Sequence, residues 1–175
     1  SMFRRILKRL ISEGTIEEKE IYKYDDTDII ALCRNSEGFI KDIMTRLDNR
    51  NFFKRAHVIR LNNFKTPEKI YRITQQQLRK AEAEIAEHYD LDKDYVILNI
   101  AEYPRFDEMK TQVSVDEKLY PLNEISNIIG ALSKARFNIP DISLYVPKED
   151  QEKFKKFKLE NFLELPEIDK NKSQG

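Results

Sequence analysis

Apolar residues recur at helical spacing through the first third of the chain. The first set follows the pattern i, i+3, i+4, i+7 and i+8, which places one apolar stripe on a helix that ends near Gly14. A second helix is predicted to begin around Asp25 to Asp28, because acidic side chains favour the positive end of a helix. A third is predicted from Phe39 onward. The apolar positions of the three helices are Phe3, Ile6, Leu7, Leu10 and Ile11, then Ile29, Ile30 and Leu32, then Phe39, Ile40, Ile43, Met44 and Leu47.

After this helical segment the hydrophobic period changes from about 3.6 to 2. A nearly continuous apolar run at 95–101 is typical of a central strand that is buried on both faces. Shorter alternating runs predict further strands, and two stretches of helical spacing lie between them. In chain order the predicted elements are a strand at 57–61, a helix over 70–89, strands at 95–101 and 113–115, a helix over 125–132, a strand at 142–146 and a short closing helix from Lys148.

This β-α-β-β-α-β order is the split β-α-β (ferredoxin-like) arrangement, in which two helices cover one face of a four-stranded sheet. The predicted fold class is therefore α+β, with N-terminal helices followed by that sheet. We expect a helical segment at 1–55, an α+β C-terminal domain at 56–160, and a disordered tail at 161–175 because its end is polar. A fold of this kind hosts many functions, so function has to be inferred from a site.

Composition narrows the class of protein. The 31 basic and 31 acidic side chains balance, so no overall field draws the chain to nucleic acid or to an anionic membrane, and we expect neither as a partner. The lone Cys33 cannot close an internal disulfide, which fits a reducing compartment. No apolar run reaches the roughly 18 residues of a spanning helix. The cytoplasm is the expected location.

The sequence lacks the residue sets of common hydrolytic sites. A metal-dependent hydrolase needs several convergent His, Asp or Glu ligands, and the chain has two histidines, His57 and His88, neither followed by Asp. Four glycines leave no phosphate-binding loop. Cys33 is interpreted as a core residue, and Asp25 and Asp26 as helix-start residues. We therefore expect no catalytic residue, metal site or cofactor in this chain, which should be inactive alone.

One group of cations is a candidate anion site. Arg46, Arg50 and Lys54 are spaced by four residues, so they form a ladder on one face if the helix from Phe39 continues that far. Arginine forks and lysine point charges can together hold a triphosphate. A solvated face is the alternative, because Asp42 lies four residues before Arg46 and can form an exposed ion pair with it. Spacing alone leaves both interpretations open.

Four segments of the chain resemble parts of a known family, in the same order and at similar spacing. The segment Asp48-Asn49-Arg50-Asn51-Phe52-Phe53-Lys54-Arg55 is similar to the one that follows the catalytic core in HD-domain phosphohydrolases of the deoxynucleoside triphosphate triphosphohydrolase type. The other segments are Tyr24 to Ile30, which resembles a short acidic helix start of that family, and Asp94 to Ile100 and Ile142 to Val146, which resemble its C-terminal strands.

The resemblance implies that the chain corresponds to the region C-terminal to an HD core. The histidine and aspartate ligands, and the divalent metal that they hold, would then belong to a core that precedes this sequence, and 1–55 would continue from it. In similar enzymes this region builds the homo-oligomer and lines nucleotide effector sites between subunits. By resemblance, Arg50, Lys54 and Lys148 are expected to contact the phosphates of a deoxynucleotide or nucleotide effector.

Two other classes of function stay open at this point. A stand-alone ferredoxin-like interaction module could bind protein or RNA, with Tyr95, Tyr103 and Tyr145 as candidate rings for base stacking. An enzyme with an unfamiliar carboxylate site could draw on acidic residues such as Glu102 and Asp107.

Overall fold

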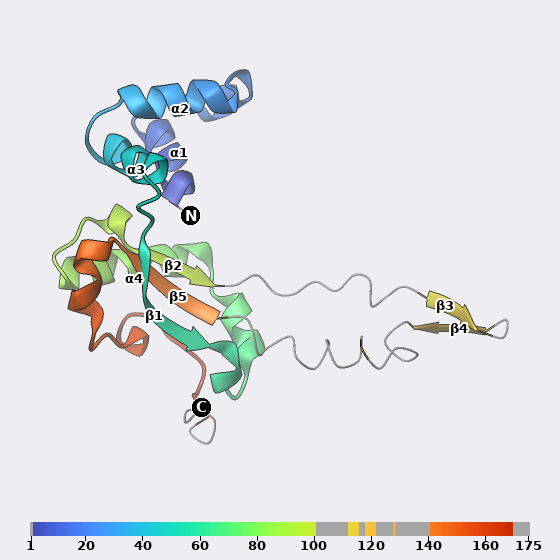
Figure 1. The fold of residues 1–175 in the computed structure, drawn as a ribbon. Helices are drawn as coiled ribbons and strands as arrows, with labels where there is room; N and C mark the ends of the chain where they lie inside the picture. Colours follow the sequence, from blue (N-terminus) through green and yellow to red (C-terminus); the bar gives the residue numbers. More distant parts are fainter. Residues whose placement is uncertain (1, 101–111, 116–117, 122–127, 129–140, 170–175) are drawn as a thin grey trace.

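The structure is a computed structural model that describes residues 2–100, 112–115, 118–121, 128 and 141–169. Figure 1 shows a helical part at one end of the molecule, joined by an extended segment to a part that contains a sheet. Each part has its own hydrophobic core, and together they confirm the α+β class predicted from the sequence.

Three α-helices form the N-terminal part: α1 (Met2–Ser12), α2 (Asp26–Asn35) and α3 (Gly38–Asp48), with the 3-10 helix η1 (Glu18–Lys23) between the first two. A capping box fixes the start of α2. The Asp25 carboxylate accepts a hydrogen bond from the backbone N–H of Asp28 at 2.8 Å, and the Asp28 carboxylate accepts one from the backbone N–H of Asp25 at 3.1 Å. The three predicted helices and the helix-start role of Asp25 are thus confirmed, and Cys33 is fully buried in this core.

The second part is built on an antiparallel sheet whose described strands are β1 (Lys54–Arg60), β5 (Asp141–Val146) and β2 (Ile97–Ile100), in the order β1-β5-β2. Strand β5 is central, because it pairs with β1 through Ile59 opposite Ile142 and with β2 through Leu98 opposite Leu144. The sequence predicted the 95–101 strand as the central one. That prediction is wrong for the described sheet, in which β2 is an edge strand.

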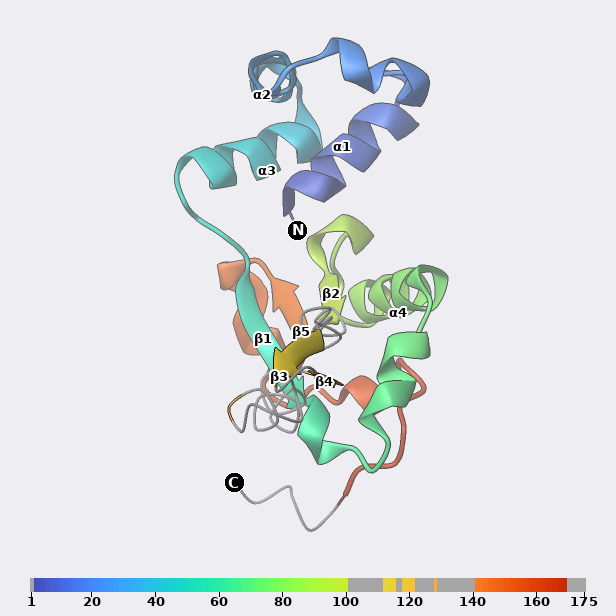
Figure 2. The ribbon, with the colours of Figure 1, turned by 90° about the vertical axis from the view of Figure 1, so that its right-hand side faces the viewer.

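Helix α4 (Gln75–His88) packs on one face of this sheet, and Figure 2 shows it alongside β2. Its buried residues, among them Leu78, Ala81 and Ile85, share a core with Leu98 and Leu144 of the strands. A capping box of Thr74 and Gln77 fixes where the helix begins. Short 3-10 helices complete this part: η2 (Leu61–Asn63), η3 (Pro67–Arg72), η4 (Lys93–Tyr95), η6 (Lys148–Phe154) and η7 (Leu159–Asn161).

The predicted four-stranded ferredoxin-like sheet is not what the described strands form. Strands β3 (Gln112–Val115) and β4 (Lys118–Pro121) pair with each other in a separate two-stranded sheet, which Figure 1 draws away from the main sheet. In the ferredoxin-like order the last strand lies at an edge, whereas β5 lies between β1 and β2. The second covering helix, predicted at 125–132, lies outside the described residues except for Ile128.

The chain after η7 is packed through residue 169, although the sequence placed 161–175 in a disordered tail. Leu163 is buried, and Leu165 and Ile168 pack against the core of the sheet. The backbone N–H of Lys65 donates to the carbonyl of Glu167 at 2.9 Å, so the segment is also held by main-chain hydrogen bonds. The expectation was wrong because it rested on the polar end of the chain and left out the apolar side chains of Phe162, Leu163, Leu165 and Ile168. Residues 170–175 lie outside the described residues.

Candidate functional site

The predicted ladder of cations is interrupted at Arg50. Helix α3 ends at Asp48, and Arg50 has a left-handed backbone with φ of 54°, which ends a right-handed helix. Its N–H donates to the carbonyl of Leu47 at 3.1 Å, and the N–H of Asn51 donates to the carbonyl of Arg46 at 2.8 Å, so the last turn is closed by its own backbone. The interpretation of three cations on one continuous helix face is therefore wrong.

The sheet nevertheless brings two of the predicted cations to one end. Lys54 is the first residue of β1 and lies opposite Val146, the last residue of β5. Lys148 follows β5 by two residues and opens η6. The next residue, Glu149, accepts a hydrogen bond from Arg46 of α3 at 2.5 Å. The ends of α3, β1 and β5 thus converge where the helical part joins the sheet.

The three predicted site residues differ from the neighbouring arginines in their side-chain partners. Arg50, Lys54 and Lys148 are exposed, and within the described residues their side chains have no ion-pair or hydrogen-bond partner. Arg46, in contrast, pairs with Asp42 and Glu149, and Arg55 lies 3.4 Å from Asp141. In the part of the chain that the structure describes, these three cations are therefore not engaged by a carboxylate.

Arg46 itself is a structural residue of this junction. Its Nε donates to Asp42 at 2.8 Å, and the same carboxylate oxygen accepts a hydrogen bond from the Tyr95 hydroxyl at 2.8 Å. The guanidinium lies 5.9 Å and 6.0 Å from the ring centroids of Tyr95 and Phe53. The hydrogen bond to Glu149 is the main cause of a raised pKa of Arg46, and burial, followed by the bond to Asp42, raises the pKa of Tyr95.

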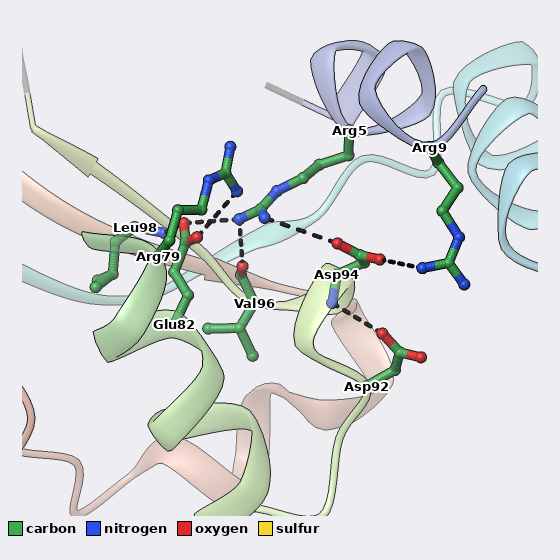
Figure 3. Close-up of polar contacts among 8 residues, drawn as sticks. All are labelled: Arg5, Arg9, Arg79, Glu82, Asp92, Asp94, Val96 and Leu98. Carbon is green, nitrogen blue, oxygen red and sulfur yellow. Dashed lines mark hydrogen bonds and ion pairs between the residues drawn. The ribbon is translucent and has the colours of Figure 1, made fainter. Parts of the chain in front are cut away.

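A second polar cluster ties α1 to α4 and β2 (Figure 3). The buried Arg5 and Glu82 form an ion pair of 2.7 Å between Nη2 and Oε1, and Arg79 donates to the other Glu82 oxygen at 3.0 Å. Arg5 also donates to the carbonyl of Val96 at 2.7 Å, and Glu82 accepts from the N–H of Leu98 at 2.9 Å. Burial raises the pKa of Glu82, and Arg5 opposes that shift.

This ion pair takes the place of a further strand beside β2. Strand β2 pairs with β5 on one side, and the Arg5–Glu82 pair satisfies Val96 and Leu98 backbone groups where a further strand would otherwise be needed. Sequence reasoning missed the pair, although a signal was present. Glu82 falls at i+4 from Leu78, on the apolar stripe of α4, and Arg5 falls between Met2 and Ile6 on the buried side of α1.

Residues considered for other chemistry lie apart or outside the described part of the chain. Among the described residues no group of three or more His, Cys, Asp or Glu side chains is placed to hold a metal ion. Burial raises the pKa of the Cys33 thiol, which disfavours the reactive thiolate. Tyr95 and Tyr145 pack against the helical core. Tyr103, Glu102 and Asp107 lie outside the described residues.

His57 is a partly buried histidine of β1. Its ring packs edge-on against Phe157, with 5.1 Å between centroids, and its Nε2 is buried without a hydrogen-bond partner. Burial lowers the pKa of His57, and Glu160 opposes this only in part. The folded chain therefore holds His57 in its neutral form more strongly than the unfolded chain does.

We expect His57 to lower the free energy of unfolding as the pH drops from about 8 to about 5. Below the ordinary histidine pKa of about 6.5 the unfolded chain binds the proton that the folded chain resists, so acid favours unfolding. His57→Gln should reduce this dependence in urea unfolding at the two pH values. His88→Gln, at an exposed position, is the matched control. An unchanged pH dependence in His57→Gln would contradict the assignment.

No helix in the part of the chain that the structure describes combines the length and the apolar character needed to cross a bilayer.

Comparisons with known proteins place the chain among regions found beside HD domains. The family model described as HD associated region matches residues 1–174. An uncharacterized protein of Methanocaldococcus jannaschii is 24% identical over 151 residues, which cover 85% of this chain and 32% of that protein. The chain thus spans about a third of the length of this curated relative. No solved structure matches the chain.

Proposed function

The chain belongs to the HD associated region family, and on that basis we propose that it is a non-catalytic accessory region of a cytoplasmic HD-type (deoxy)nucleotide phosphohydrolase. In this role it supports a homo-oligomer and binds a nucleotide effector through Arg50, Lys54 and Lys148. The enzyme would be of the deoxynucleoside triphosphate triphosphohydrolase type. Its divalent metal would be held by the HD core and not by this chain.

The observation that carries the proposal is the set of unpaired cations at the junction of the two parts. Arg50, Lys54 and Lys148 are exposed and have no side-chain partner within the described residues, whereas Arg46 and Arg55 beside them are paired. An unpaired cation can bind a phosphate without first losing a carboxylate partner.

An exposed aromatic ring supports a nucleotide as the anion. Phe52 lies between Arg50 and Lys54 in the sequence and is 47% exposed. A ring of this kind can stack on a base while the cations hold the phosphates. The ion pairs of Arg46 with Asp42 and Glu149 hold the neighbouring chain in place, so the site needs little ordering when the ligand binds.

We expect Arg50→Ala/Lys54→Ala to weaken binding of a deoxynucleoside triphosphate by at least about tenfold, because each lost charged hydrogen bond is worth about 1.5 to 3 kcal/mol. The measurement is titration calorimetry on the full-length HD-domain protein, with sedimentation velocity to follow nucleotide-driven assembly. The charge-matched control is Lys69→Ala/Arg72→Ala in η3, where both side chains are exposed beyond the other end of β1.

Two results would refute the effector role. One is a wild-type protein that neither binds deoxynucleotides nor changes its sedimentation in their presence. The other is a double variant at Arg50 and Lys54 that binds and assembles as the wild type does.

A further inference from the structure

A second basic surface lies beside the Arg5–Glu82 ion pair described above, and both members of the pair line it. Helices α1 and α4, together with η4, line a groove of about 730 Å³. Two of its lining residues are acidic, Glu82 and Asp94. Six are basic: Arg5, Lys8, Arg9, Arg79, Lys80 and Lys93.

The acidic residues of the groove are already neutralised within the protein. Glu82 is paired with Arg5 and Arg79, and Asp94 lies 3.0 Å from Arg9 (Figure 3). The three arginines take part in these contacts and the lysines do not. The electrostatic potential of the groove is therefore positive on its solvent side.

The three lysines have few competing partners. Lys8 and Lys93 form no ion pair or hydrogen bond within the described residues, although Lys8 acts electrostatically on Glu82. Lys80 lies 3.7 Å from Glu84, and with 79% of its side chain exposed this pair contributes little. The first turn of the 14-residue helix α4 also contributes Gln76 and Gln77 to the lining, so the positive end of the helix dipole faces the same space.

We propose that this groove is a binding site for a polyphosphate anion, separate from the site at Arg50, Lys54 and Lys148. None of the described residues that line it is aromatic, so a base would find no ring to stack on, and recognition would be through charge.

Such a ligand would also bridge the two parts of the molecule. Lys8 belongs to α1 of the helical part, and Lys80 and Lys93 belong to α4 and η4 of the sheet part. An anion held by all three stabilises the junction that the Arg5–Glu82 pair already holds, so binding should raise the melting temperature of the chain.

The test is titration calorimetry of the 175-residue chain with inorganic tripolyphosphate and with a deoxynucleoside triphosphate, supported by thermal melting. We expect Lys8→Gln/Lys93→Gln to weaken tripolyphosphate binding at least about tenfold. The same change in charge at Lys69→Gln/Arg72→Gln, and the Arg50→Ala/Lys54→Ala variant, should leave it within about twofold of the wild type. Unchanged melting temperatures without ligand confirm that the exposed-lysine variants fold.

The outcomes separate the two sites and the two sources of phosphate. In both supporting outcomes, Lys8→Gln/Lys93→Gln weakens binding. Equal affinity for tripolyphosphate and for the deoxynucleoside triphosphate means that polyphosphate alone is sufficient. An affinity for the nucleotide that is higher by tenfold or more identifies a nucleotide as the ligand. Binding that is lost only at Arg50 and Lys54 overturns the groove proposal and leaves the effector site standing. Three other results also overturn the groove proposal. They are no binding of tripolyphosphate, an equal loss of affinity in the Lys69→Gln/Arg72→Gln control, and tighter binding of a DNA or RNA oligonucleotide.

Discussion

Replacing Arg5 by alanine should lower the free energy of unfolding by about 3 to 5 kcal/mol, because it leaves the buried Glu82 without its charge partner. Glu82 is 4% exposed, and its carboxylate would retain only Arg79 and the N–H of Leu98. The carbonyl of Val96 would lose its donor as well. Urea unfolding followed by circular dichroism measures the change.

The pH dependence of this loss identifies its cause. Burial already raises the pKa of Glu82, and removing Arg5 raises it further. A carboxyl group whose folded pKa lies above its unfolded pKa binds its proton better when folded, so stability falls as the pH rises through that range. Arg5→Ala should therefore be less destabilising near pH 5 than near pH 8. A loss that is the same at both pH values would assign the effect to packing and not to the charge of Glu82.

Two further variants serve as controls for Arg5→Ala. Arg4→Ala changes the neighbouring residue of α1, which is exposed, and should cost less than about 0.5 kcal/mol. Arg5→Met/Glu82→Gln removes both charges and keeps an amide oxygen for the N–H of Leu98, so it should recover part of the loss. A double variant that is less stable than Arg5→Ala would contradict the unpaired charge of Glu82 as the cause of the loss.

The helices were predictable because their information is local. The apolar stripe of α1 and the acidic start of α2 each specify an element within a few residues, and both are confirmed. The order of strands was not predictable in this way, since alternation identifies a strand but not its neighbours. The apolar run of β2 was interpreted as central, whereas its free edge is closed by Arg5, which lies 91 positions from Val96 in the sequence.

The candidate site, too, could be predicted only in part from the sequence. The family resemblance selected Arg50, Lys54 and Lys148, and the chain belongs to the HD associated region family. The helical ladder that first drew attention to two of them is absent, because Arg50 adopts a left-handed backbone. Lys54 and Lys148 share one end of the sheet through the pairing of β1 with β5, which connects residues far apart in the sequence.

Phe53→Ala should be the second most damaging of these substitutions, with a loss of about 3 to 5 kcal/mol in the free energy of unfolding. Phe53 is 7% exposed, its ring stacks on Tyr95 with 5.9 Å between centroids, and Arg46 lies over its face. The side chain belongs to the helical core while the next residue begins β1, so removing it opens a cavity where the two parts join.

The adjacent Phe52 provides the matched control, because it is the same residue type with 47% of its surface exposed. Phe52→Ala should cost less than about 1 kcal/mol, because little apolar surface is lost from the core. The two variants also test how the effector site is held. If a buried Phe53 fixes the segment from Arg50 to Lys54, Phe53→Ala should weaken nucleotide binding together with stability, whereas Phe52→Ala should weaken binding alone through a lost stacking partner. Equal losses of stability in both variants would contradict the burial of Phe53 as the cause.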